Sequence, residues 1–281
     1  GLMEPTGAGV GGDLFAIVWD AGERRLRGLN ASGRSPLSLS LEQLRGQGFS
    51  QIPTYGPLSV SVPGAVCGWH ELHSKFGRLA LSELLEPAIE YAEQGFAVTE
   101  VIAQDWANDV ALFAGFPGFA DTFMPGGAAP AAGDVFANPR LAATYRAIAD
   151  GGREAFYSGE IPERVERYML DNGGFLGADD FAQHRSEWVE PVSTSYRGFE
   201  IWELPPNGQG IAVLQMLNML EDHDLAALGW GSAKYLHLLI EAKKLAFADR
   251  AWFYADPEFA AAPVTELISK DYCRQRAGLI D

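Results

Sequence analysis

The pattern of apolar and polar residues predicts a hairpin near the N-terminus and a further strand in the last third of the chain. Asp13–Asp20 predicts a strand, Ala21–Glu23 a turn, and Arg24–Ala31 the returning strand of the hairpin. Val189–Tyr196 is expected to be extended. It leads to Phe199–Leu204, whose aromatic and branched residues predict another strand.

Two helices are predicted after this strand. Ile211–Leu220 is apolar nearly all round, which is typical of a helix buried in a protein interior. Ser232 is a favourable N-cap for a long helix that reaches about Tyr254. Its apolar line is predicted to consist of Tyr235, Leu239, Ala242 and Ala246, with Leu236, Ile240 and Phe247 beside it.

Shorter segments predict further helices and one irregular stretch. Ser82 is the expected N-cap of one helix, and Gly95 is its expected terminator. The prolines and glycines of residues 116–138 predict a long surface excursion, and Ala155–Ile161 predicts a turn. The remaining helices are expected over Ser40–Arg45, from Val66 to about Phe76, and over Leu81–Gln94, Glu100–Phe113, Pro139–Asp150 and Pro162–Asp171, with a short one from Ala178.

Two loops that contain glycine are candidate walls of a binding site. In Pro205–Gly210 the prolines end the strand, and the glycines permit turns that aim backbone N–H groups at an anion or a polarised carbonyl. The alternative for this loop is a tight turn into a core helix. Asn30–Pro36 contains one arginine among small polar residues, and it suits a pocket wall and an ordinary solvated loop equally.

Composition and charge exclude several functional classes. The chain has 281 residues, 47% of them hydrophobic, which is enough for one large domain or two small ones. The net charge of −16 and the lack of a basic run exclude binding to nucleic acid or to an anionic membrane surface. Gln215 and Asn218 interrupt the most apolar segment, so no membrane span is predicted. Because the sequence begins at Gly1, we expect any targeting segment to lie outside it, and no compartment is assigned.

Motifs for cofactors and metals do not have the context that their chemistry requires. Gly7–Gly12 matches G-x-G-x-x-G, but a strand follows it where a nucleotide site needs a helix. His70 and His73 are three residues apart, whereas the zinc motif needs four. Cys67 and Cys273 are expected to be free, buried thiols. No cofactor and no metal are therefore predicted.

Candidate catalytic groups are also scarce. The chain has no G-x-S-x-G elbow, and nothing near Cys67 indicates an activated thiolate. His237 and Glu241 are four residues apart on the long helix, and a structural pair is favoured over a catalytic dyad. The residues by themselves therefore indicate a scaffold with a pocket and no nucleophile.

Eight segments form an ordered series along the chain: Glu4–Phe15, Val62–Gly64, Pro87–Phe96, Phe156–Ile161, Asn172–Gly174, Tyr196–Gly198, Leu214–Asn218 and Glu241–Arg250. Together they resemble, from about residue 1 to residue 281, the large subunit of the gamma-glutamyltranspeptidase family. The resemblance implies an α+β fold, the αββα sandwich of N-terminal nucleophile hydrolases. Residues 1–281 are then expected to be a single domain, a large-subunit fragment.

The resemblance also implies a mechanism and a partner. Family members cut their own precursor, and the new N-terminal threonine of the small subunit is the nucleophile, with its own amine as base. An acyl-enzyme forms from a gamma-glutamyl amide such as glutathione, and the acyl group passes to water or to an amino acid. No threonine of this sequence has the family's cleavage context, so no catalytic residue is expected here. The expected partners are the small subunit from the same precursor and a small-molecule amide.

Two departures from the family pattern concern substrate binding. Ser32 stands where the family has an arginine that grips the α-carboxylate of the substrate, and a serine cannot supply that bidentate, charged grip. Arg34 would face the same side as Ser32 in an extended segment and is a candidate replacement. Asn207 and Gly208 follow the proline pair where the family has a Ser-Ser-Gly-Gly run. These four residues are the candidate substrate-binding residues.

Three functions follow from these departures. The first is an amidohydrolase or acyltransferase whose acyl group need not be glutamyl, as in the branch of cephalosporin acylase-like and oxamate amidohydrolase-like enzymes. The second is a true gamma-glutamyltransferase or glutathione hydrolase in which Arg34 grips the substrate. The third is a non-catalytic relative that binds a ligand or partner.

Overall fold

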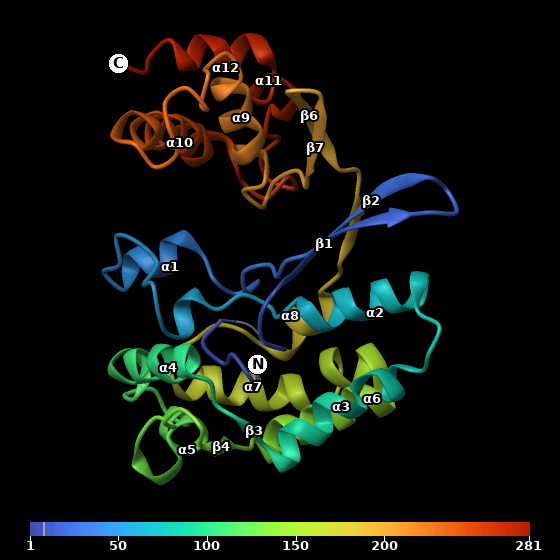
Figure 1. Ribbon diagram of the computed structural model, residues 1–281. Coiled ribbons are helices and arrows are strands. Elements are labelled where there is room, and N and C mark those ends of the chain that lie inside the picture. The colour runs from blue at the N-terminus through green and yellow to red at the C-terminus, as the bar shows by residue number, and fades with distance from the viewer. Residues whose placement is uncertain (8) are drawn as a thin grey trace. The chain divides into compact units, whose positions relative to one another are not determined.

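The computed structural model describes residues 1–7 and 9–281, so Ala8 of the glycine-rich segment lies outside the described residues (Figure 1). The chain forms two compact units. The first consists of residues 1–15 and 31–186, and the second of residues 16–30 and 187–281. The expectation that residues 1–281 make up a single domain stays a prediction.

The first unit is mainly helical. Its only pair of short strands within the described ranges is antiparallel, Phe96–Ala97 (β3) against Val135–Phe136 (β4). Two single-turn 3₁₀ helices cover Pro57–Ser59 and Pro125–Gly127. The α-helices are α1 (Leu41–Gly46), α2 (Ala65–Phe76), α3 (Leu81–Gln94), α4 (Glu100–Phe113), α5 (Phe119–Phe123), α6 (Pro139–Tyr157), α7 (Glu160–Asp171) and α8 (Ala178–Gln183).

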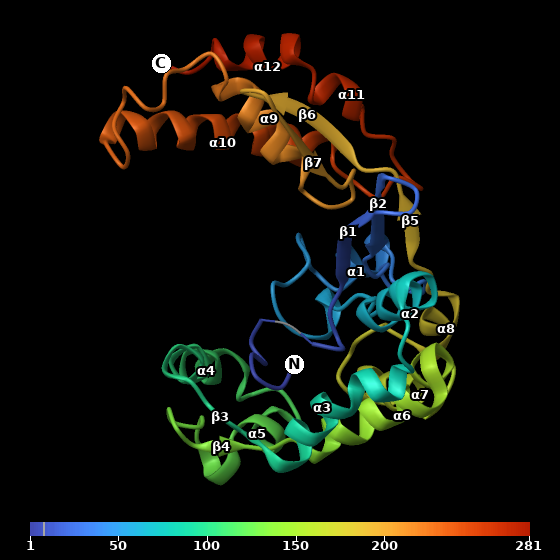
Figure 2. The ribbon, with the colours of Figure 1, turned by 45° about the vertical axis from the view of Figure 1, so that its right-hand side comes forward.

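The core of the first unit forms where α3 and α6 pack along each other, side by side in both views (Figures 1 and 2). Ile89 and Ala92 of α3 and Ile148 of α6 are buried in it. Trp106 of α4 is buried beside them, with its ring centroid 4.7 Å from that of Phe136, and its indole N–H bonds the carbonyl of Phe123. Burial of these aromatic and branched side chains is the main favourable term in the folding of this unit.

The second unit combines strands with four helices among its described residues. Leu14–Asp20 (β1), Arg25–Ala31 (β2) and Glu187–Val189 (β5) form a sheet in the order β1-β2-β5, with Leu29 opposite Trp188. A second antiparallel pair places Thr194 opposite Ile201. The other elements are β6 (Val192–Tyr196), β7 (Phe199–Glu203), α9 (Ile211–Leu220), α10 (Ala233–Phe253), α11 (Val264–Leu267) and α12 (Lys270–Ala277).

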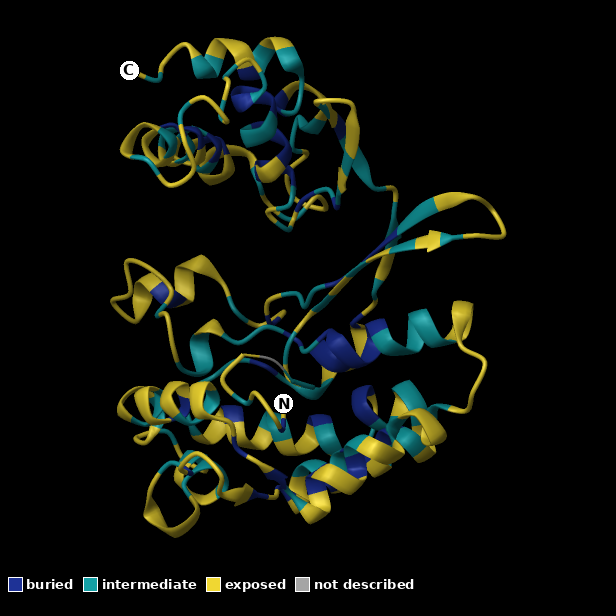
Figure 3. Ribbon diagram, in the orientation of Figure 1, coloured by how far each residue is buried: buried dark blue, intermediate teal, exposed yellow. Residues whose placement is uncertain are grey.

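Helix α9 is the core of the second unit, as its nearly uniform apolar composition predicts (Figure 3). Its two polar residues, Gln215 and Asn218, are buried but have hydrogen-bond partners. The Gln215 amide donates to the Asp249 carboxylate over 2.8 Å, and the Asn218 amide accepts from Thr194 over 2.8 Å. The second oxygen of Asp249 lies 3.1 Å from Arg276. Pairing of this kind offsets the cost of removing these polar groups from water.

Most of the predicted elements are confirmed, including α4, α9 and the cap of α10 at Ser232. Gly95 ends α3 with a φ of 91°, as expected, but the N-cap is Ala80 and not Ser82. Ser82 lies in the first turn because the helix begins one residue before it. Both cysteines are free and buried, as predicted.

Two other predictions about local structure were wrong, over residues 116–138 and over Ala155–Ile161. Residues 116–138 are not all irregular, because α5, a 3₁₀ turn and β4 form within them and bury Phe136. The helix predicted to end at the glycine pair does break there, because Gly152 leaves helical geometry with a φ of 61°, and a second helical stretch of α6 follows through Tyr157. The predicted turn over Ala155–Ile161 is therefore helical at both ends.

The long helix α10 also differs in detail from its predicted apolar line. Ala242 and Ala246 are buried as expected, but Leu238 is buried with them, while Leu236 and Ile240 are exposed. The buried side of α10 therefore follows Leu238, Ala242 and Ala246, which are four residues apart, and it only partly overlaps the predicted apolar line.

The predicted pair of His237 and Glu241 does not form. His237 contacts the carbonyl oxygen of Asp281 over 2.9 Å, and Glu241 pairs with Lys244 over 2.7 Å. Neighbouring positions on a helix allow a pair but do not select it over other partners.

We predict that Asp249→Ala lowers the free energy of unfolding by about 3 kcal/mol, because it leaves the buried Gln215 amide and the Arg276 guanidinium without their acceptor. Urea unfolding followed by circular dichroism measures the change. Asp271→Ala is the matched control, since it breaks an exposed ion pair with Arg274 and is expected to change stability by less than about 1 kcal/mol. Equal effects of the two variants would contradict the structural role of Asp249.

Candidate functional site

The segment Ser32–Arg34 follows the hairpin and is held by the first unit from two sides. On one side, the Gly33 N–H donates to the Asp13 carboxylate over 2.9 Å. On the other side, the Val62 N–H donates to the carbonyl oxygen of Arg34 over 3.0 Å. Ser32 and Arg34 are both half-buried. The predicted pocket wall is therefore an ordered backbone segment and not a freely solvated loop.

Two glycines let this segment approach the turn before α2 closely. A Cβ at Gly33 would overlap with the carbonyl group of Val62, and a Cβ at Gly64 would overlap with the carbonyl group of Ala31. Both positions therefore require glycine for steric reasons and not for an unusual φ. The Gly64 N–H also donates to the carbonyl oxygen of Gly12 over 3.0 Å. The glycine-rich segment, the hairpin end and the Val62–Gly64 motif thus meet at one place.

Tyr157 fixes the turn before α2 from the opposite side. Its buried hydroxyl donates to the carbonyl oxygen of Pro63 over 2.6 Å and accepts from the Cys67 N–H over 3.0 Å. Burial raises the pKa of the Tyr157 hydroxyl well above its usual value, so the group remains a donor. The sequence did not single out Tyr157 as a site residue, although it lies within the Phe156–Ile161 motif.

His184 stacks on Tyr157, with ring centroids 5.3 Å apart and an angle of 17° between the planes. It is 2% exposed, and neither ring nitrogen has a hydrogen-bond partner among residues 1–7 and 9–281. Burial, and then the charges of Arg34, Arg153 and Arg185, lower its pKa to about 4. The imidazole is therefore neutral at physiological pH.

Arg34 lies at the C-terminal end of α8. Its guanidinium donates to the carbonyl oxygen of Arg185 over 3.4 Å, a long hydrogen bond. Arg153 approaches the same end of the helix and donates to the carbonyl oxygen of His184 over 2.5 Å. Free carbonyl groups at a helix C-terminus attract cations, which explains why these arginines gather there. The Arg34 side chain is therefore already engaged by the protein.

The other two predicted site residues belong to the second unit. The side chain of Asn207 accepts from the side-chain amide of Asn30 over 2.7 Å, which links the proline-rich turn to the end of the hairpin strand. Gly208 is half-buried in the same turn. Gly210 lies against the Glu203 carboxylate, where a Cβ would overlap with it. Ser32 and Arg34 are in the first unit and Asn207 and Gly208 in the second, so each pair is placed only within its own unit.

The arrangement presents polar side chains and backbone groups from Ser32, Gly33 and Arg34, held in place by Asp13 and Val62. The Cys67 thiol is buried, and both ring nitrogens of His184 are without a hydrogen-bond partner among the described residues. The residues around the segment that sequence reasoning did not single out are Asp13, Tyr157 and His184. A pattern in the sequence cannot reveal them, because each contacts residues that are distant in the sequence. Tyr157 and Cys67, for example, are 90 positions apart.

The described part of the chain contains no group of three or more His, Cys, Asp or Glu side chains arranged to hold a metal ion. None of its helices combines the length and the apolar character that a membrane span needs.

We predict that Tyr157→Phe destabilises the first unit by about 1–3 kcal/mol, because a buried carbonyl and a buried N–H lose their common partner. Thermal unfolding measures the effect. Tyr168→Phe is the control, since Tyr168 is 38% exposed and makes a single hydrogen bond, to the carbonyl oxygen of Pro117. A Tyr157 variant as stable as the Tyr168 variant would refute this role.

A pH dependence follows from His184. The folded protein binds a proton at His184 less readily than the unfolded chain, in which histidine titrates near 6.5. The stabilisation is therefore present above about pH 6.5 and is lost as the pH falls toward 4, by up to about 3 kcal/mol.

His184→Phe keeps the stacking on Tyr157 and removes the titrating group, so its urea midpoint is expected to change less than that of the wild type between pH 7.5 and 4.5. His237→Gln, at an exposed position, serves as the control and should follow the wild type. Parallel pH curves for the wild type and His184→Phe would exclude this effect.

Comparison with known proteins identifies the family. The sequence model of the gamma-glutamyltranspeptidase family matches residues 1–281. The chain is 38% identical over 277 residues to the glutathione hydrolase-like YwrD proenzyme of Bacillus subtilis strain 168, which covers 98% of this chain and 52% of that protein. It is 43% identical over 226 residues to the acylase ACY 1 proenzyme of Pseudomonas sp. strain V22, which covers 80% and 40%.

The structural comparison agrees. The crystal structure of cephalosporin acylase from Bacillus halodurans matches with a TM-score of 0.92 and 39% identity, over 100% of this chain and 53% of that chain. The chain thus spans about half the length of these relatives. The family match over its whole length shows that this chain belongs to the gamma-glutamyltranspeptidase family and has the α+β fold of its N-terminal nucleophile hydrolases.

Proposed function

We propose that this chain is the large-subunit portion of an autoprocessed amidohydrolase or acyltransferase that cleaves a small amide with an acyl group other than glutamyl. The observation that carries the proposal is the Ser32–Arg34 segment, which is ordered, close-packed and lacks an arginine at its first position. Relatives named as an acylase and as glutathione hydrolase-like support the reaction class.

The nucleophile is then supplied by the rest of the precursor. After self-cleavage, the hydroxyl of an N-terminal threonine attacks the amide carbon, and the α-amine of that threonine takes the hydroxyl proton. The C–N bond of the substrate breaks, the protonated amine leaves, and an ester remains on the threonine. Water or an amino acid then takes the acyl group from the ester and regenerates the hydroxyl.

The part of this chain in the reaction is to bind and orient the acyl group. The Ser32 hydroxyl can donate or accept one hydrogen bond, whereas a guanidinium would form two charged bonds to a carboxylate. Asp13 and Val62 hold the backbone around Ser32, so the hydroxyl is offered from a fixed position. This wall favours acyl groups that lack the α-carboxylate of a glutamyl group.

A glutathione hydrolase is the second candidate function. The hydrogen bond of Arg34 to the Arg185 carbonyl is 3.4 Å long, which is weak for a charged donor, so a substrate carboxylate could compete for the guanidinium. The two candidate functions differ in whether Arg34 contacts the substrate, and the KM of an Arg34 variant measures this difference.

The test uses the full-length precursor, with intact mass first showing whether it yields two chains. Ser32→Arg is expected to raise kcat/KM for a gamma-glutamyl anilide by about ten-fold or more, because it supplies the missing carboxylate ligand.

Arg34→Ala should leave the KM for glutathione unchanged, as should the exposed control Arg45→Ala. A sharp rise in KM for Arg34→Ala alone would establish the glutathione hydrolase, and a precursor that stays in one piece would support a non-catalytic relative.

A further inference from the structure

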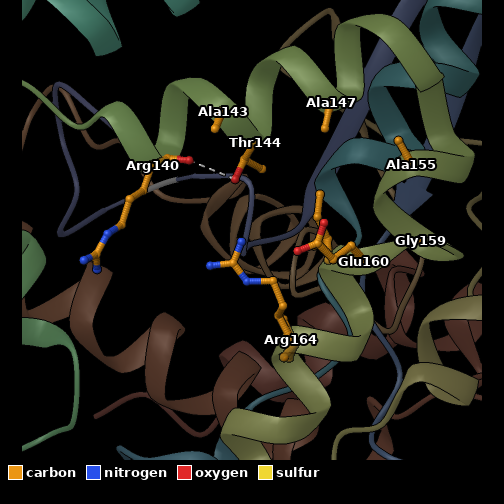
Figure 4. Close-up of a pocket in the computed structure, with 10 residues that line it drawn as sticks. Arg140, Ala143, Thr144, Ala147, Ala155, Gly159, Glu160 and Arg164 are labelled. Atoms are coloured by element: carbon orange, nitrogen blue, oxygen red, sulfur yellow. Dashed lines mark hydrogen bonds between the residues drawn. The ribbon is translucent and has the colours of Figure 1, made fainter.

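A cavity of about 630 Å³ lies between α6 and α7 of the first unit (Figure 4). This volume is in the range of sites that hold small organic molecules. None of its lining residues belongs to the Ser32–Arg34 segment or to the residues that hold it. The cavity is lined by Arg140, Ala143, Thr144, Ala147, Ala155, Gly159, Glu160, Ile161, Arg164 and Val165.

The sequence of the two helices leaves this space unfilled. Ala143, Thr144 and Ala147 stand on one face of α6, because residues three and four positions apart on a helix are neighbours, and their side chains are too short to reach α7 (Figure 4). Ile161 and Val165 of α7 supply the larger part of the apolar wall. A largely apolar hollow with a few charged groups is the usual form of a ligand site.

The positively charged groups at this cavity are two arginines from different helices. Arg140 comes from α6 and Arg164 from α7 (Figure 4). Within the described residues, neither guanidinium forms an ion pair or a side-chain hydrogen bond. Two other arginines of α6 do: Arg146 pairs with Glu93 over 2.6 Å, and Arg153 pairs with Glu154 over 2.9 Å.

Acidic residues outnumber basic ones in this chain by 37 to 21. Glu160 also lines the cavity, four residues before Arg164, but it is not within ion-pair distance of either arginine in the described structure. The lining therefore carries one more positive charge than negative charge, on a protein whose net charge is −16. An anion that reaches this cavity finds donors that the protein itself does not use.

We infer that this cavity binds a small organic carboxylate with an apolar aromatic or branched body. The guanidinium of Arg164 or Arg140 takes the carboxylate, since the planar fork of an arginine matches its two oxygens. Ala143, Ala147 and Val165 contact the apolar body, whose removal from water contributes the remaining affinity.

The test is calorimetric titration of the purified protein with 4-phenylbutyrate and with its neutral isostere 4-phenylbutanamide. The two molecules share the apolar body and differ only in charge. We expect saturable binding of the acid with a Kd about ten-fold lower than that of the amide. Because the protein is strongly acidic, unspecific attraction cannot produce this preference. No saturable binding of the acid, or equal affinity for both molecules, would overturn the inference.

Matched variants locate the binding. Arg140→Gln with Arg164→Gln is expected to remove the preference for the acid, while Arg167→Gln, which changes the same charge on α7 outside the lining, should keep it. Ala147→Trp fills the cavity and is expected to abolish binding of both molecules. If Ala147→Trp does not fold, the arginine variants decide, and an identical loss of affinity in Arg167→Gln and in the double variant would refute the site.

Discussion

The backbone of residues 31–34 lies against the backbone of residues 62–65 at a separation that only glycine permits. Side chains at Gly33 or Gly64 would overlap with carbonyl groups of the facing segment. Around this contact, Asp13 accepts from Gly33 and the Tyr157 hydroxyl bridges Pro63 and Cys67. The candidate substrate wall thus depends on packing between main chains, and its position is set before any ligand arrives.

The contact between the two backbone segments fixes the candidate substrate wall independently of the groups that react. Under the proposed function, this backbone holds the neutral hydroxyl of Ser32 against the acyl group. Under the proposed function, specificity for the acyl group depends on the side chain at this position, and the attacking group comes from the rest of the precursor. Such a division explains how one family can contain proteins named as acylases and as glutathione hydrolases.

The two units handle buried polar groups in different ways. In the second unit, Gln215, Asn218 and Asp249 satisfy one another or nearby groups, so their burial fixes how α9, α10 and α12 pack. In the first unit, His184 is buried as a neutral ring with no partner for its nitrogens among the described residues, and its stability depends on pH. Buried polar groups that are paired rigidify a core. A buried histidine without a partner makes the stability of the core depend on its protonation.

The sequence by itself determined the elements whose cause is local. Hydrophobic periodicity placed α4 and α9, a serine placed the start of α10, and the order of short motifs indicated the family and its fold. Sequence spacing did not determine side-chain pairing where another partner was within reach, because His237 contacts the carbonyl oxygen of Asp281 and not Glu241.

Only the tertiary structure decided which distant residues act together. Asp13, Tyr157 and His184 act near the Ser32–Arg34 segment, and Arg34 donates to a carbonyl group just after α8. These contacts join positions up to about 150 residues apart in the sequence. The cavity between α6 and α7 exists because side chains on two helices are too short to meet. Hydrogen bonds and packing of this kind are set by the folded path of the chain, and a linear pattern of residue types carries no record of that path.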